Sequence, residues 1–93
     1  MRSYKAAIVA LTNFKNNFPD SEYIEEASYL VVASEYKLAL ISIPSKQEER
    51  YKAVVEHYKE FVDTYPKSVF LKDAERYYAE SLNKLTKSKN NNL

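Results

Sequence analysis

The chain lacks cysteine and glycine altogether, and each absence excludes a kind of chemistry. Without cysteine, these residues can form no disulfide, no thiolate metal site, no cysteine nucleophile and no lipid-accepting thiol. Without glycine, they cannot form a glycine-rich phosphate-binding loop. The redox compartment stays open, because a chain without thiols fits oxidising and reducing compartments equally.

Long apolar runs and strongly charged segments are missing as well. No stretch approaches the roughly 18 consecutive apolar residues that a membrane-spanning helix needs. The 93 residues include 14 Lys and Arg against 13 Asp and Glu, and the two signs are interleaved along the chain. This balance, with 45% apolar residues, is typical of a folded globular chain. Nucleic acid is therefore not expected as a partner.

The chain is interrupted by three prolines, Pro19, Pro44 and Pro66. Proline cannot continue a helix, and it disfavours the helical conformation in the residue before it. Between the prolines, apolar residues recur at spacings of three and four, which is typical of amphipathic helices. We therefore predict an all-α fold with loops at the prolines and no strand. The predicted helices span approximately residues 3–17, 21–42, 46–64 and 68–87.

Serines indicate where three of these helices begin. Ser21 and Ser68 each follow a proline turn, where a serine oxygen can accept a hydrogen bond from the free amides of the next helix. Ser45 and Glu48 have the spacing of a capping box, in which the two side chains bond each other's backbone amides. We expect all three serines to act as helix caps.

The chain superposes on itself with a shift of 47 residues, which places Tyr4 on Tyr51. The identities join Tyr4, Phe14, Pro19, Ser21 and Ala27 to Tyr51, Phe61, Pro66, Ser68 and Ala74. One helical hairpin is thus used twice, in units 4–41 and 51–87. Ala27 and Ala74 put a small residue at the same place in both units, and we expect them to be buried where helices cross at short distance.

The two copies differ in the second face of their second helices. Outside its core stripe, the helix predicted at 21–42 carries Tyr29, Val32, Ala33, Tyr36 and Leu40. The helix predicted at 68–87 carries Arg76, Ala79, Glu80, Asn83 and Lys87 at matching places. A helix that is apolar all round is buried on both sides, so we expect the second helix to be enclosed. We expect the fourth helix to keep one solvent-exposed face, as the last helix of a stack does.

The first helix carries an apolar face outside its core stripe, formed by Ala6, Val9 and Ala10. We expect this face to be exposed or covered by another copy of the chain. Two repeats also fall short of the roughly three that stacked units usually need for stability. The 93 residues are accordingly expected to be a fragment of a longer chain.

No group of residues points to catalysis. His57 is the only histidine, and no further ligand or nucleophile is predicted to face it. We expect it to be a solvated residue on the outer face of the third helix. The chain is expected to be no enzyme and to bind no metal or cofactor.

Tyrosine is abundant, with nine copies. Five of them follow the core stripes and are expected to pack inside: Tyr4, Tyr51, Tyr58, Tyr65 and Tyr78. Tyr29, Tyr36 and Tyr77 lie off these stripes, where an aromatic ring can face another helix or a bound ligand segment.

Two segments carry a family resemblance. Tyr4-Lys-Ala-Ala-Ile and Tyr51-Lys-Ala-Val-Val each lead through an aromatic-Pro turn to an alanine, Ala27 or Ala74. This pattern resembles the extended tetratricopeptide repeats of BamD-type outer-membrane assembly lipoproteins. The resemblance implies a tetratricopeptide-like solenoid fragment of four helices over residues 1–87, made of tandem helical hairpins, and a frayed tail over 88–93.

The resemblance also implies a function. Members of that family are periplasmic scaffolds, associated with the outer membrane through a lipid anchor that would lie outside these residues. They bind the periplasmic domains of the β-barrel insertase and unfolded barrel proteins. Two alternatives stay open: a periplasmic Tol-Pal coordinating protein, whose repeats are very similar, and a tetratricopeptide cochaperone.

A partner surface can be predicted from the large side chains that the core stripes leave over. Aromatic and arginine side chains carry most of the binding energy of interfaces. We therefore expect the second helix, the loop after it and the fourth helix to contact the partner. The candidate residues are Tyr29, Tyr36, Ile43, Arg76 and Tyr77. Lys59 and Glu60, on the predicted outer face of the third helix, should contribute little.

Overall fold

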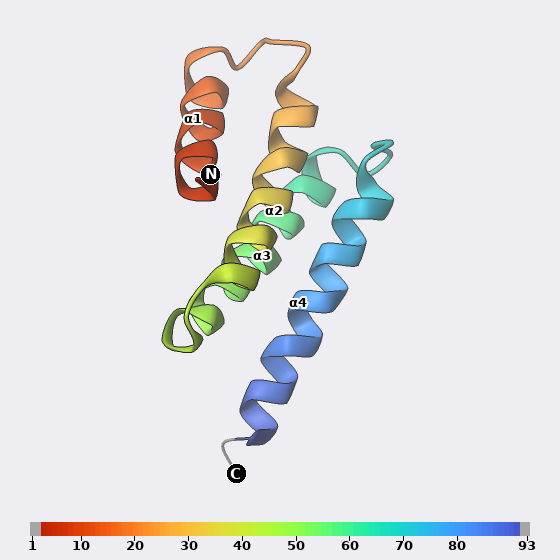
Figure 1. The fold of residues 1–93 in the computed structure, drawn as a ribbon. Helices are drawn as coiled ribbons and strands as arrows, with labels where there is room; N and C mark the ends of the chain where they lie inside the picture. Colours follow the sequence, from red (N-terminus) through yellow and green to blue (C-terminus); the bar gives the residue numbers. More distant parts are fainter. Residues whose placement is uncertain (1–2, 92–93) are drawn as a thin grey trace.

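The computed structural model describes residues 3–91, with side chains as far as Lys87. Four helices make up this range: α1 (Tyr4–Asn17), α2 (Ile24–Ile41), α3 (Pro44–Thr64) and α4 (Leu71–Asn91) (Figure 1). No strand occurs between residues 3 and 91. The predicted all-α fold of tandem helical hairpins is confirmed.

The turn between α2 and α3 is shorter than predicted. The third helix begins at Pro44, and Ile43 takes the cap position without a side-chain hydrogen bond. The predictions of a loop at Pro44 and of a capping box are therefore wrong. Proline at the first helical position loses no hydrogen bond, since the amide there has no partner within a helix. Glu48 pairs instead with Lys52 one turn later, at 3.0 Å.

The two proline turns are longer than predicted. The hydroxyl oxygen of Ser21 accepts from the amide of Tyr23 at 3.1 Å, and that of Ser68 accepts from the amide of Phe70 at 3.0 Å. Each serine thus closes a local turn, and α2 and α4 begin three residues further on. The prediction that these serines cap the helices directly is wrong.

The end of the chain also differs from the prediction. The backbone of α4 stays helical to Asn91, beyond the predicted end at residue 87. The last part of the predicted tail, residues 92–93, lies outside the described residues.

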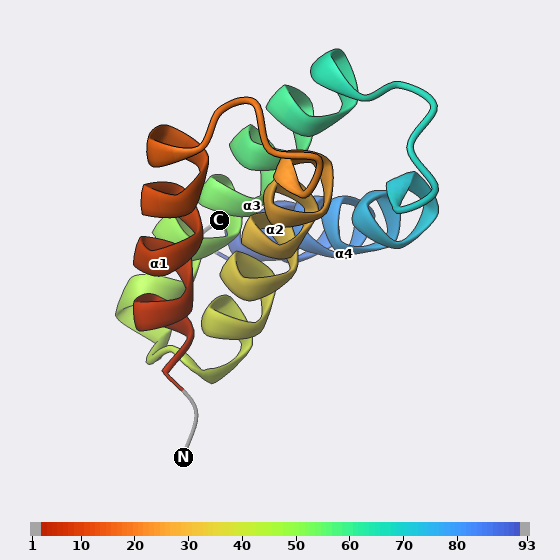
Figure 2. The same ribbon diagram turned by 90° about the horizontal axis from the view of Figure 1, so that it is seen from above.

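Helix α2 lies at the centre of the molecule, between α1 and α4 (Figure 1), and α3 packs along it (Figure 2). Among the described helices, α2 contacts all three others, whereas α1 contacts α2 alone. Val32 and Ala33 of α2 are buried, and Leu40 is exposed. On α4, Arg76 and Glu80 are exposed. The predicted contrast between an enclosed second helix and a fourth helix with a wet face is confirmed, except at Leu40.

The core sits between α2, α3 and α4. Its buried members are Val32, Val54, Tyr58, Phe61 and Ala74, with half-buried aromatic rings around them. Ala27 and Ala74 are both buried, as predicted for close helix crossings. Of the five tyrosines predicted to pack, Tyr51 and Tyr58 are buried and the other three are half-buried.

Helix α1 is the least covered element. None of its residues is buried, and the Val9 side chain is 60% exposed. Ala6 and Ala10 are exposed as well, so the predicted exposure of this face is confirmed.

Candidate functional site

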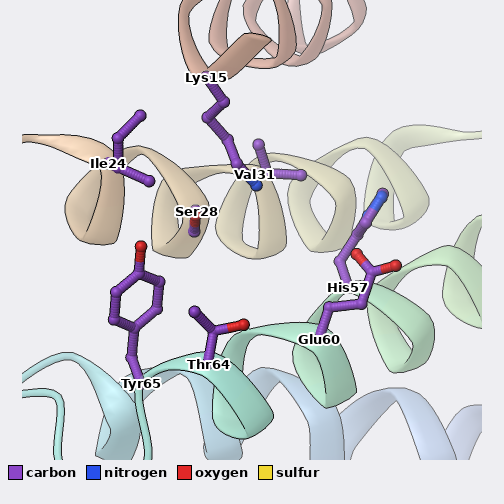
Figure 3. A pocket seen from close by; sticks show the side chains of 8 residues that line it. All are labelled: Lys15, Ile24, Ser28, Val31, His57, Glu60, Thr64 and Tyr65. Carbon is purple, nitrogen blue, oxygen red and sulfur yellow. The ribbon is translucent and has the colours of Figure 1, made fainter. Parts of the chain in front are cut away.

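A pocket of about 390 Å³ lies between α1 and α3. It forms because both helices pack on α2 without packing on each other. We call it the α1–α3 pocket. Its lining residues are Lys15, Ile24, Ser28, Val31, His57, Glu60, Thr64 and Tyr65 (Figure 3).

Helical spacing aligns these side chains. Ile24, Ser28 and Val31 are separated by four and three residues, so they share the face of α2 that forms the floor. His57, Glu60 and Thr64 are separated by three and four residues on α3 and form one wall. The opposite wall belongs to α1, from which the long side chain of Lys15 descends toward Val31 (Figure 3).

The two ends of the pocket differ in chemistry. Tyr65, Thr64 and Ser28 place hydroxyl groups at one end (Figure 3). His57 and Glu60 lie at the other end, and Lys15 reaches down between the two ends. The floor is apolar at Ile24 and Val31, and hydrogen-bonding and charged groups surround these two residues. Such a pocket suits an amphipathic ligand, because the polar groups can fix its orientation.

Beside the charged end, the ring of His57 meets the buried carboxylate of Glu35 on α2. The distance between His57 Nδ1 and Glu35 Oε2 is 3.2 Å. The contact is an ion pair when the ring is protonated. The contact with Glu35 raises the pKa of His57 above its usual 6.5, against the lowering effect of burial, and the negative charge of Glu60 adds to the rise.

The sequence-based interpretation of His57 was therefore wrong. The residue is half-buried and bridges α3 to α2 instead of standing free in solvent. The signal in the sequence that could have revealed this contact is Glu35. This carboxylate lies in α2 between Ala33 and Leu38, which are both buried. A carboxylate in such a place needs a partner, because burying an unpaired charge is costly. Glu60, which was predicted on the outer face of the third helix, is exposed and also lines the pocket.

Three of the predicted partner-binding residues are stacked between α2 and α4. The ring of Tyr29 stacks on Phe70 with centroids 4.9 Å apart, and Tyr36 stacks on Tyr77 at 4.8 Å. The hydroxyl of Tyr36 also donates a hydrogen bond to Glu80. Tyr29, Tyr36 and Tyr77 are half-buried, so their ring faces already serve the packing of the chain.

Burial is the main cause that raises the pKa of Tyr29 to about 12. The pKa of Tyr36 also rises to about 12, through burial first and then through its hydrogen bond to Glu80. Both hydroxyls therefore stay neutral well above neutral pH.

The other two predicted residues are more open. The guanidinium of Arg76 is exposed and lies over the ring of Tyr77, 5.3 Å from its centroid. Ile43 is 63% exposed in the turn between α2 and α3, apart from the stacked rings. The structure thus brings four of the five residues together and leaves Ile43 separate.

The fold and the pocket define a class: an all-α protein of tandem helical hairpins with an open hollow between α1 and α3. Comparison with protein families is more specific. Residues 1–90 match the YfiO family, described as outer membrane lipoproteins, and the chain belongs to this family. Comparison with curated proteins gave no match. None of the described helices is long and apolar enough to cross a membrane.

Proposed function

We propose that this chain is a protein-binding scaffold in the assembly of outer-membrane β-barrel proteins. It contacts the periplasmic domains of the barrel insertase and helps to deliver unfolded barrel substrates. It works in the periplasm and acts by binding, without catalysing a reaction. Membership of an outer membrane lipoprotein family supports the compartment and the membrane association.

The α1–α3 pocket is the observation that carries the proposal. Its volume of about 390 Å³ falls in the range of ligand clefts, and three helices hold its walls in place. Lys15 and Glu60 offer opposite charges within it. An extended or turned segment of a protein partner can place an apolar side chain on Val31 and Ile24 while its polar groups meet these charges.

The surface formed by Arg76 and the edges of the stacked tyrosines is expected to make a smaller contribution to partner binding. Because the ring faces of Tyr36 and Tyr77 stack on each other, only their edges remain for a partner. Arg76 lies 3.9 Å from the Asp73 carboxylate, and its exposed guanidinium can also meet an acidic group of a partner. Ile43 offers an apolar contact in the turn between α2 and α3. We expect each of them to contribute less than the pocket.

Binding to the periplasmic region of the insertase from the same organism tests the proposal. Lys15→Ala and Glu60→Ala should each weaken binding. Together they should lower the affinity about thirtyfold, which corresponds to about 2 kcal/mol of binding free energy. Lys59→Ala, one residue away on the outer side of α3, is the matched control and should change affinity little.

Equal affinity of all these variants would place the contact elsewhere on the molecule. Loss of binding for Arg76→Ala and Ile43→Ala alone would transfer the site to the α2–α4 side. Binding to a Tol-Pal component with no binding to the insertase would favour the coordinating protein instead.

A further inference from the structure

The α1–α3 pocket contains two cationic groups that come from different helices. Lys15 descends into it from α1, and the ring of His57 rises into it from α3 (Figure 3). Both residues are half-buried. Lys15 belongs to none of the ion pairs among the side chains described up to Lys87. Its charge is therefore available to a ligand.

The two acidic groups near these cations are placed differently. Glu35 is buried in α2 and already contacts His57. Glu60 is exposed on α3, where water screens its charge. A partly buried charge is screened much less. Half-buried Lys15 consequently gains more from a ligand of opposite charge than Glu60 does.

The contact with Glu35 determines which part of the His57 ring remains for a ligand. Nδ1 is buried and lies 3.2 Å from Glu35 Oε2. The side chain as a whole is 35% exposed, so the open part of the ring is the edge away from Nδ1, which carries Nε2. In the protonated ring both nitrogens are donors, so Nε2 can bond a ligand while Nδ1 faces Glu35.

We propose that the α1–α3 pocket binds an acidic side chain, Asp or Glu, of the protein partner between Lys15 and the protonated ring of His57. The carboxylate accepts a hydrogen bond from Nε2 and pairs with the Lys15 amine. Glu35 is the positioning residue, because it holds the ring and its proton. This inference deepens the proposed function and rests on it, since it takes this pocket as the contact site of the partner.

Binding of a carboxylate at this place is coupled to the protonation of His57. Three charged groups act on the ring, one from each helix around the pocket. Glu35 on α2 raises the pKa of His57 most, burial opposes this rise, Glu60 on α3 adds to it, and Lys15 on α1 lowers it. A bound carboxylate adds a negative charge and offsets that of Lys15, so it raises the pKa of His57 further. Affinity therefore increases as pH falls through the range between the free and the bound pKa.

Ligand groups of another charge would give a different pH dependence. A basic group in the same place would lower the pKa of His57, and its affinity would increase as pH rises. A neutral group would leave the affinity nearly independent of pH. The direction of the pH dependence thus reports the sign of the ligand charge.

The first test measures binding to the periplasmic region of the barrel insertase at pH 6 and pH 8.5, which bracket the usual histidine pKa of about 6.5. His57→Gln keeps a polar side chain that cannot be charged. It should weaken binding at least about fivefold at pH 6 and less than about twofold at pH 8.5. Titrating groups of the insertase affect both proteins equally, so the ratio of the two affinities isolates His57. Lys15→Gln should weaken binding at both pH values, whereas Lys59→Gln on the outer side of α3 should not.

The second test uses the chain alone with a small acidic probe, N-acetyl-glutamate methylamide. Its glutamine analogue is the neutral control, at equal ionic strength. In an NMR titration, the midpoint of His57 should rise with the acidic probe and stay constant with the neutral one. The rise should be much smaller in Lys15→Gln, because the carboxylate then lacks its second partner.

The two tests separate this inference from the proposed function. If the midpoint does not rise with the acidic probe, or if His57→Gln weakens insertase binding equally at both pH values, the inference is overturned while the scaffold role stands. If the midpoint rises but the insertase binds at neither pH, the proposed function is overturned and the carboxylate site stands.

Discussion

His57 illustrates how one residue can join two helices and report on their contact. The pKa of His57 is raised by Glu35, so the protonated ring is favoured in the folded chain. The pair therefore stabilises the fold fully below the unfolded pKa of about 6.5, and this contribution is lost as pH rises through the higher folded pKa.

Titration of His57 by NMR checks this account directly, because the chain contains a single histidine. The midpoint should lie above 6.5 in the parent chain and fall in Glu35→Gln, which keeps the shape of the side chain without its charge. Glu60→Gln should lower it less, since Glu60 is the smaller cause. A midpoint that stays unchanged in Glu35→Gln would show that the two side chains do not interact in solution.

Ala27 and Ala74 occupy matching places in the repeat, but their surroundings differ. Ala74 is fully buried in the core. Ala27 borders a pocket of about 300 Å³ between α1 and α2, the α1–α2 socket, which Leu11, Phe14 and Leu30 also line. Ala74→Leu should cost about 1 to 3 kcal/mol of unfolding free energy through overpacking. Ala27→Leu should cost less, because the added carbons can enter the socket. Urea unfolding of both variants measures the difference, and equal costs would mean that the socket is closed in solution.

At the scale of elements, the short turn between α2 and α3 depends on side-chain bonds to the end of α2. The Ser42 hydroxyl donates to the carbonyl of Leu38 at 2.6 Å, and the Gln47 amide donates to the carbonyl of Ala39 at 3.1 Å. These carbonyls stand in the last turn of α2, where the regular helical amide partners run out. The Ala39 carbonyl also accepts the backbone amide of Ser42 at 3.3 Å. The two side-chain bonds allow the chain to reverse within Ser42 and Ile43.

Gln47→Ala should therefore destabilise the chain by about 0.5 to 1.5 kcal/mol, the usual net worth of one hydrogen bond. Gln47→Glu is the informative companion, because it keeps the length of the side chain but removes the donor. Thermal unfolding of both variants is the measurement. If Gln47→Glu were as stable as the parent chain, the bond to Ala39 would have no part in the turn.

The order and approximate positions of the helices could be predicted from the sequence, because proline and the spacing of apolar residues act locally. The first residues of α2 and α4 could not be predicted, because a serine such as Ser21 or Ser68 can either close a local turn or cap a helix. Pro44 likewise fits both a loop and the first position of a helix. The α1–α3 pocket was missed for another reason: it depends on α1 and α3 lying apart on α2, which no local pattern records.

At the scale of the whole molecule, the chain is an elongated stack of 47 by 30 by 19 Å with unlike ends. Its α4 side is polar at Arg76 and Glu80, and its α1 side is apolar at Val9 and Leu30. The α1–α3 pocket lies between these ends, over α2.

The most direct test of the scaffold account is photo-crosslinking from the wall of the α1–α3 pocket. A photoreactive amino acid replaces Thr64, which lines the pocket, and in a matched protein it replaces Lys59 on the outer side of α3. Each protein is irradiated with the periplasmic region of the barrel insertase. The account predicts an adduct from position 64 that Lys15→Ala and Glu60→Ala together suppress, and little adduct from position 59. Crosslinking from position 59 with none from position 64 would contradict it.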